Sequence, residues 1–142
     1  MEKTCSFQKL VCGVCDSDKR YKRSEIVLLA SCQRDIEVHA RSVGINDVHS
    51  EVDLILSRAS VFSLPPDLSS WTICPAHRSR LGIGWRRKVN QCRVPERLAS
   101  HAKKRKADRG IRKCESRYSL KHTGIFVPAG SGMYALFFFD MC

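Results

Sequence analysis

Apolar residues between positions 24 and 58 recur at the three- and four-residue spacing of amphipathic helices. A first stripe consists of Ile26, Leu29, Ala30, Ile36, Ala40 and Val43, and a second of Val48, Val52, Ile55 and Leu56, with Leu54 beside it. Ser24 is suited to begin the first helix and Gly44 to end it. Asn46 or Asp47 could begin the second. The pattern therefore predicts a helical hairpin over residues 24–58.

A segment rich in helix-breaking residues follows at positions 59–73. It contains Pro65-Pro66, and consecutive prolines cannot continue a helix because they lack backbone N–H donors. We therefore expect the main domain boundary here. The predicted parts are a Cys-containing lead-in (1–23), a helical hairpin (24–58), a Pro-rich connection (59–73), a basic Cys/His module (74–132) and an apolar C-terminal tail (133–142). The tail is much shorter than a membrane-spanning helix, so we expect no membrane partner.

The positive charge of the chain is concentrated in one third of its length. Residues 76–122 hold 16 of the 25 Lys and Arg residues and 3 of the 14 acidic residues, which gives +13, whereas the other residues together carry −2. Such a block attracts polyanions, because binding releases the counterions that phosphates condense. The alternative is a solvated face that only keeps the protein soluble.

The eight cysteines favour metal ligation over disulfides. They occupy positions 5, 12, 15, 32, 74, 92, 114 and 142. The N-terminal residues contain no apolar run of signal-peptide length, so we expect a reducing compartment, where closely spaced cysteines are more often metal ligands. We expect Cys32, in an apolar stretch, to be a buried thiol, and Cys5 and Cys142, near the ends, to be free.

Two short pairs have the spacing of zinc knuckles, namely Cys12-x2-Cys15 and Cys74-x2-His77. Two intervening residues let a tight turn direct both donor atoms at one ion, and two such pairs supply the four tetrahedral ligands of a structural Zn²⁺. A competing site consists of Cys74, His77, Cys92 and His101. Candidates to complete a second ion site are Cys32, Cys114 and His122. The sequence therefore predicts a small zinc-stabilised α+β domain with a helical hairpin and little regular strand.

The residues from Cys74 onward also resemble a known module. They read Cys74-Pro75-x-His77-Arg78, Leu81-Gly82-Ile83, Trp85-Arg86, Cys92, Pro95, His101 and Asp108-Arg109-Gly110-Ile111. Over residues 74–132 this string resembles an uncharacterised Cys/His, zinc-finger-like module of invertebrate multigene families. The family has no assigned activity, so the resemblance implies a zinc-type module and no particular function. Its pattern continues into further cysteines, whereas here residues 127–132 are followed by MYALFFFDMC.

The cationic run Lys103-Lys104-Arg105-Lys106 is typical of nuclear localisation signals. We therefore expect a nuclear location, with the cytoplasm as the alternative.

Trp85 could stack on an unpaired base or form an apolar plug beneath the metal knuckle. The candidate nucleic-acid-binding residues are Trp85, Arg86, Arg87, Lys88, Lys103, Lys104, Arg105, Lys106, Arg109, Arg112 and Lys113.

These patterns favour a zinc-stabilised protein that binds DNA or RNA with modest specificity. One alternative is a nuclear adaptor that binds a protein through residues 24–58, whose acids Asp47, Glu51 and Asp53 would repel phosphates. Another is an inactive, truncated remnant of a mobile-element or multigene-family protein. Strong salt dependence of nucleic-acid binding would separate binding protein from adaptor. The sequence lacks the motifs of serine hydrolases, phosphate loops, zinc proteases and nucleobase deaminases, so we expect no enzyme.

Overall fold

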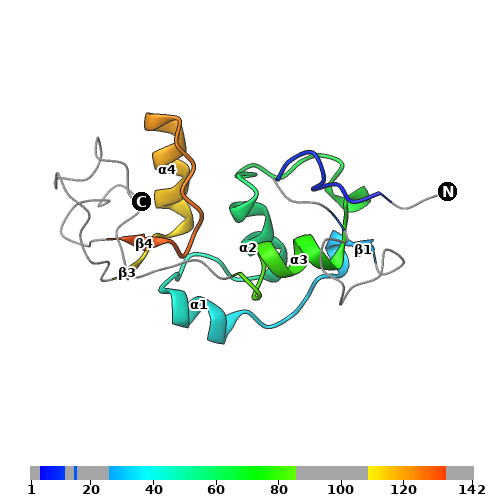
Figure 1. Cartoon of the computed structure of the whole chain (residues 1–142), viewed down its shortest axis with the longest axis horizontal. Helices are drawn as coiled ribbons and strands as arrows, with labels where there is room; N and C mark the ends of the chain where they lie inside the picture. Colours follow the sequence, from blue (N-terminus) through cyan, green and yellow to red (C-terminus); the bar gives the residue numbers. More distant parts are fainter. Residues whose placement is uncertain (1–3, 12–14, 16–25, 86–108, 134–142) are drawn as a thin grey trace. The chain divides into compact units, whose positions relative to one another are not determined.

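The computed structural model describes residues 4–11, 15, 26–85 and 109–133. The chain forms two compact units: unit 1 comprises Met1–Asp35 and Ser50–Arg86, and unit 2 comprises Ile36–His49 and Arg87–Cys142. The part that is described contains four α-helices and two short, two-stranded sheets (Figure 1). This content is compatible with the predicted α+β class and its small amount of strand.

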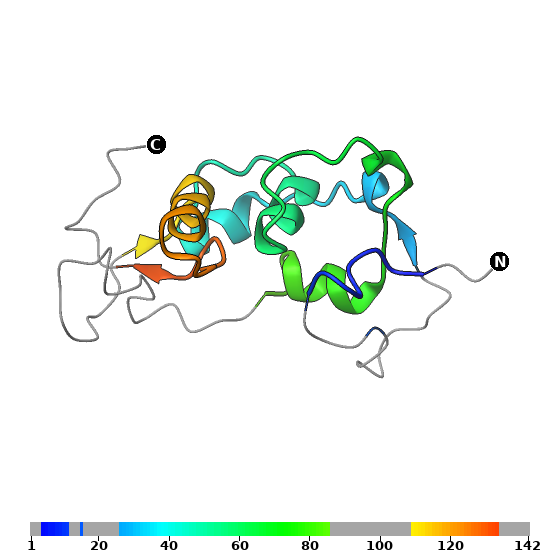
Figure 2. The same ribbon diagram turned by 90° about the horizontal axis from the view of Figure 1, so that it is seen from above.

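A narrow sheet in unit 1 joins segments that are far apart in the sequence. Strand β1 (Val27–Leu28) pairs antiparallel with β2 (Thr72–Ile73). The N-terminal segment also lies alongside β2. The N–H of Ser6 donates to the carbonyl of Thr72 at 3.0 Å, and the N–H of Thr72 donates to Ser6 Oγ at 2.9 Å. Figures 1 and 2 both show this blue segment beside the green chain. The first described residues are thereby held next to residues 72–74.

Helix α2 (Glu51–Arg58) begins at a capped end and packs its apolar side inward. Ser50 is the N-cap, and its Oγ accepts the N–H of Asp53 at 3.1 Å, which satisfies one of the free amides of the first turn. Leu54 and Ile55 are fully buried. The apolar spacing around residue 55 therefore predicted a real helix, although it begins a few residues later than expected.

Helix α3 (Pro75–Leu81) packs against α2, and charged side chains tie the two together. The buried Glu51 carboxylate accepts two hydrogen bonds of 2.8 Å from the Arg78 guanidinium. The buried Arg58 donates to the carbonyl of Gly82 at 2.8 Å, at the C-terminal end of α3. The last carbonyls of a helix carry partial negative charge, so a cation is favourable there.

The hydrophobic core of unit 1 gathers side chains from its N-terminal segment, its sheet and both helices. Its members are Cys5, Phe7, Ile26, Leu29, Cys32, Ile55, Leu56, Ala59, Ile73, Cys74, Ala76 and Leu81. Phe7 is fully buried, and its ring meets Trp71 edge-on with the centroids 5.7 Å apart. Burial of a large apolar side chain stabilises a fold by roughly 1.5–3 kcal/mol, so Phe7 anchors the N-terminal segment in unit 1.

Unit 2 contains the helices α1 (Glu37–Val43) and α4 (Lys113–Thr123). The glycines Gly44 and Gly124 end them with φ of 75° and 71°, a left-handed conformation in which glycine is not strained. Strand β3 (Arg109–Gly110) pairs antiparallel with β4 (Gly132–Met133).

Hydrogen bonds from distant residues hold α4 in unit 2. The Asp47 carboxylate accepts the N–H groups of Lys113 and Cys114, each at 2.9 Å, and so caps the helix from outside its own segment. On the buried side, Ser116 Oγ donates to the carbonyl of Val127 at 2.5 Å. The helix therefore has partners for its first amides and for a buried hydroxyl within its own unit.

Two predictions about organisation differ from the structure. Residues 24–58 do not form one hairpin: the chain at residues 27–28 is strand, α1 belongs to unit 2, and α2 belongs to unit 1. The N–H of Leu29 donates to the carbonyl of Trp71 at 2.8 Å, so tertiary pairing uses a backbone group that a continuous helix would need. Pro65-Pro66 lies inside unit 1, whose second segment runs unbroken through it, and not at a boundary between units.

Candidate metal centre

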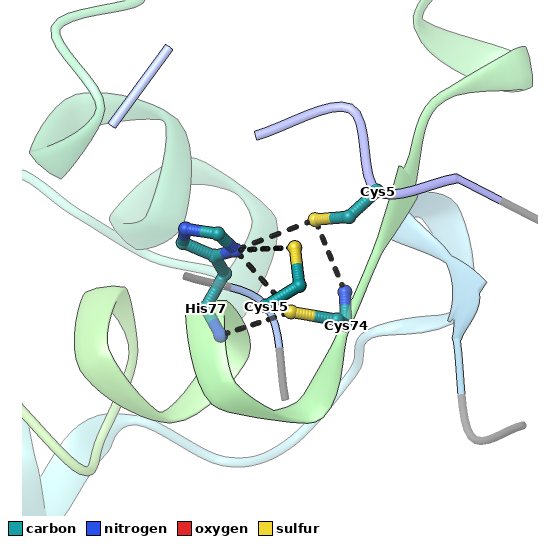
Figure 3. A group of neighbouring side chains, drawn as sticks. All are labelled: Cys5, Cys15, Cys74 and His77. Atoms are coloured by element: carbon teal, nitrogen blue, oxygen red, sulfur yellow. Dashed lines mark hydrogen bonds between the residues drawn. The ribbon is translucent and has the colours of Figure 1, made fainter. Parts of the chain in front are cut away.

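Four side chains that can ligate a metal converge in unit 1. They are Cys5, Cys15, Cys74 and His77, and their donor atoms all lie within 4.8 Å of one another (Figure 3). Cys5, Cys74 and His77 are buried, and Cys15 is half-buried. The three thiols and one imidazole form a Cys3His site that could bind a metal ion.

The start of α3 places Cys74 and His77 together. Cys74 is the N-cap in an extended conformation, and Pro75 occupies the first helical position, where its fixed φ suits the helix and its missing N–H is not needed. The N–H of His77 donates to Cys74 Sγ at 3.4 Å, a capping bond with sulfur as acceptor. The turn brings Cys74 Sγ to 3.2 Å from His77 Nδ1.

Cys5 lies next to Cys74 and His77 because its segment of the chain lies alongside β2. The N–H of Cys74 donates to Cys5 Sγ at 3.3 Å. Cys5 Sγ and Cys15 Sγ each lie 3.5 Å from His77 Nδ1. Cys74 Sγ and Cys5 Sγ thus each accept a backbone N–H group.

The distances from the three sulfurs to the imidazole nitrogen are close to those of a tetrahedral ion. Zinc bonds of about 2.3 Å to sulfur and about 2.0–2.1 Å to nitrogen place a sulfur and a nitrogen ligand about 3.6 Å apart in tetrahedral geometry. The three distances from sulfur to His77 Nδ1 are 3.5, 3.5 and 3.2 Å. Ordinary packing of thiols brings single pairs this close, but four donors around one point have the arrangement of a coordination shell.

Two thiols of the cluster, those of Cys5 and Cys15, have a raised pKa. Burial raises the pKa of Cys5, against the opposing effect of its backbone hydrogen bonds. Burial, followed by the neighbouring sulfurs of Cys74 and Cys5, raises the pKa of Cys15 to about 12. A bound divalent cation reverses this balance, because it attracts the thiolates that otherwise repel one another.

The structure brings together three of the six residues predicted as metal ligands, Cys15, Cys74 and His77. The other three, Cys12, Cys92 and His101, lie outside the described residues. Cys5 was expected to be free; it forms no disulfide, but its sulfur lies in the cluster, which was not predicted from the sequence. The sequence feature that could have indicated the burial of Cys5 is the apolar–polar–apolar order of Cys5, Ser6 and Phe7. In the structure Cys5 and Phe7 are buried and Ser6 is half-buried, the alternation that an extended segment gives.

Two further cysteines have settled roles. Cys32 is a buried thiol, as predicted, and burial raises its pKa. Cys114 is disulfide-bonded, so it does not offer a thiolate to a second ion.

The predicted nucleic-acid-binding residues are only partly described. Arg86, Arg87, Lys88, Lys103, Lys104, Arg105 and Lys106 lie outside the described residues, and only the backbone of Arg109 is described. Trp85 is 8% exposed, and the Arg58 guanidinium lies 4.2 Å from its ring centroid. Its predicted role in base stacking is therefore not supported, because a cation already covers the ring.

Two other predicted nucleic-acid-binding residues have partners within unit 2. Arg112 Nε donates to the buried Glu115 at 3.1 Å, and the N–H of Lys113 donates to Asp47.

Comparisons of the chain with protein-family models, with curated proteins and with solved structures find no match. Among the described helices, none has the length and apolar character needed to cross a membrane. The donor geometry is thus the principal guide to function.

Proposed function

We propose that the protein is a zinc-stabilised nucleic-acid-binding protein. Cys5, Cys15, Cys74 and His77 hold one structural Zn²⁺, and the basic segment 76–122 binds the phosphates of DNA or RNA with modest specificity. The observation that carries the proposal is the convergence of four donor atoms within 4.8 Å.

The donor set favours zinc over other metals. Thiolate and imidazole ligands suit a borderline-soft ion, whereas magnesium and calcium bind oxygen ligands. Four protein ligands complete a tetrahedral shell and leave no position for water or substrate, which is characteristic of structural zinc. The ion would hold the N-terminal segment against α3, two parts of unit 1 that are about 70 residues apart in sequence.

The charge of the chain supports the nucleic-acid part of the proposal. The +13 of residues 76–122 is surplus positive charge, since the rest of the chain carries −2. Phosphate contacts by Lys and Arg contribute affinity without reading bases, which is the basis for proposing modest specificity. The run Lys103-Lys104-Arg105-Lys106 accounts for a proposed nuclear location.

Metal analysis of the protein, purified under reducing conditions, tests the zinc site. We expect about one zinc per chain, and loss of that zinc in Cys5→Ser and Cys74→Ser. Cys32→Ala is the matched control, since Cys32 is a buried thiol outside the cluster and its removal should leave the zinc in place.

Cys12→Ser decides between the two ligand sets. If Cys5 is a ligand, the Cys12→Ser protein keeps its zinc, whereas the knuckle pairing of Cys12 with Cys15 predicts its loss. A Cys5→Ser protein that retains full zinc would contradict the proposed site. Zinc-loaded protein that fails to bind DNA and RNA even at low salt would leave the adaptor as the better interpretation.

A further inference from the structure

Helix α4 has two sides of different character. The buried side carries Glu115, Ser116 and Ser119. The outward side carries three basic residues, of which Arg117 and Lys121 are exposed and Lys113 is half-buried. Figure 2 shows α4, the yellow-to-orange helix, nearly end-on. We refer to Lys113, Arg117 and Lys121 as the basic stripe.

The basic stripe follows directly from helical geometry. Its members are four residues apart, so they lie about 6 Å apart along the axis and within about 80° of its circumference. The centre of that arc is almost opposite the buried side, because each residue of a helix advances by about 100°. The stripe is therefore a straight row of cations facing away from the interior of unit 2.

Local helix stability explains only one member of the stripe, Lys121, which lies in the last turn, where a cation is favourable. Like charges four residues apart repel, and a cation in the first turn opposes the helix dipole. In the described part of the chain, neither Arg117 nor Lys121 forms an ion pair. Glu115, in the first turn of the same helix, is buried and bonded to Arg112. The row of charge is best explained by a polyanion that binds it.

Two rings adjoin the stripe. The rings of Tyr118 and His122 lie against each other, with centroids 4.1 Å apart and planes inclined by 36°. His122 is exposed, and Tyr118 is half-buried. Tyr118 is three residues before Lys121, a spacing that makes two side chains neighbours on a helix surface, so the ring pair borders the stripe at Lys121. Ring faces beside a row of cations are the combination that binds single strands, because phosphates and unpaired bases are held at the same time.

We propose that the outward side of α4 binds single-stranded nucleic acid, with backbone phosphates on Lys113, Arg117 and Lys121 and a base stacked on the ring pair of Tyr118 and His122. The inference rests on the proposed function and deepens it, since it assigns the binding surface and the strandedness of the ligand. It assigns the contacts to unit 2, whereas the candidate zinc ligands belong to unit 1.

The charge contribution is tested with the full, zinc-loaded chain and a labelled oligouridine of about 20 nucleotides, long enough for one site. Arg117→Ala/Lys121→Ala is compared with Lys9→Ala/Arg41→Ala, which removes the same charge from exposed residues elsewhere. Alanine is the strongest helix former, so α4 should persist. Two lost contacts should reduce the slope of log K against log salt by about 1.4, which corresponds to about 20-fold weaker binding near 0.1 M salt. The control pair should bind as wild type does.

Stacking is tested by His122→Ala against the same oligouridine and against duplex DNA of equal length. Loss of one stacked base should weaken single-strand binding by about fivefold or more and leave duplex binding unchanged. Equal effects on both ligands, or none on either, would overturn the single-strand assignment.

The two proposals fail in distinguishable ways. If wild type binds neither ligand at low salt, the nucleic-acid function itself is wrong. If wild type binds but the α4 pair binds as tightly as the control pair, the surface is wrong and the function stands. In that case replacement of Lys103, Lys104, Arg105 and Lys106 by alanine should instead abolish most of the salt dependence.

Discussion

Unit 1 and unit 2 satisfy their buried polar groups in different ways. In unit 2, Glu115 accepts the N–H of Arg112, and Ser119 Oγ donates to the carbonyl of Ile125 at 3.0 Å. In unit 1, three sulfurs and the His77 imidazole face one another around a common point. The first arrangement is completed by the chain itself, whereas the second could hold a metal ion, and we propose that a cation completes it.

The difference indicates that the apolar core of unit 1 is too small to stabilise it alone. A short segment such as residues 4–11 can bury few side chains, and Phe7 is its principal anchor in the core. Small units of this kind commonly need a metal or a disulfide, because their apolar core alone barely offsets the entropy lost on folding. We infer that the metal replaces, in unit 1, part of the network of hydrogen bonds that surrounds α4 in unit 2.

Removal of the metal should give the largest difference in stability between the two units. Zinc contributes on the order of 10–16 kcal/mol in zinc-finger peptides, as much as the whole stability of a typical domain. With a chelator, and anaerobically without reductant so that the disulfide of Cys114 in unit 2 stays intact, the amides of His77 and Gly82 should lose their protection from hydrogen exchange. The amides of Ile111 and Gly124, which bond within unit 2, should keep theirs. Equal loss in both units would show that the comparison is mistaken.

A substitution at Gly110 should damage unit 2 and spare the metal site. A Cβ there would lie 1.7 Å from the carbonyl oxygen of Val43, so Gly110→Ala should destabilise unit 2 by about 3 kcal/mol or more. Gly124→Ala is the matched control: φ is 71° and no heavy atom lies within 4 Å, so only the backbone cost of about 1 kcal/mol applies. Denaturant unfolding measures both, and both proteins should retain zinc. A Gly110→Ala protein as stable as Gly124→Ala would contradict the close approach.

Glu51→Gln tests how much of unit 1 depends on contacts other than the metal. Burial would raise the pKa of Glu51, but the hydrogen bonds from Arg78 and from the N–H of Arg34 outweigh it and hold the pKa below its ordinary value. The folded-state pKa is lowered, so the stabilisation is present at neutral pH and is lost as the pH falls below about 4.5 and through the folded-state pKa. At pH 7 the variant should lose about 2 kcal/mol.

The exposed pair of Glu37 and Arg41 in α1 gives the smallest effect and serves as the control. Its side chains are 70% and 74% exposed, so Glu37→Gln should change stability by less than about 0.5 kcal/mol. The measurement is the free energy of unfolding of each zinc-loaded variant at pH 7, relative to wild type. A loss in Glu51→Gln no larger than that in Glu37→Gln would show that the charge of Glu51 is not the source of the stabilisation.

Local chemistry in the sequence accounts for part of the fold. Gly44 ends α1 as predicted, because a helix C-terminus that turns left-handed favours glycine. Ile55 and Leu56 are buried in α2, as their spacing indicated, and Leu54, which was placed beside that stripe, is buried as well. Asp47 was expected to begin the second helix, yet its carboxylate caps α4, whose first residues come 66 and 67 positions later. A capping residue has the same local pattern whichever helix it caps, so only the tertiary structure selects its partner.

The candidate metal centre shows the same division. The sequence alone indicated that Cys74 and His77 can point at one position, because two intervening residues allow a tight turn, and in the structure their donor atoms lie 3.2 Å apart. It also determined the excess positive charge of residues 76–122. That Cys5 joins them was decided by tertiary structure only. Its position depends on the pairing of Ser6 with Thr72 and on the burial of Phe7, and these energies come from the whole of unit 1 and not from the spacing of cysteines.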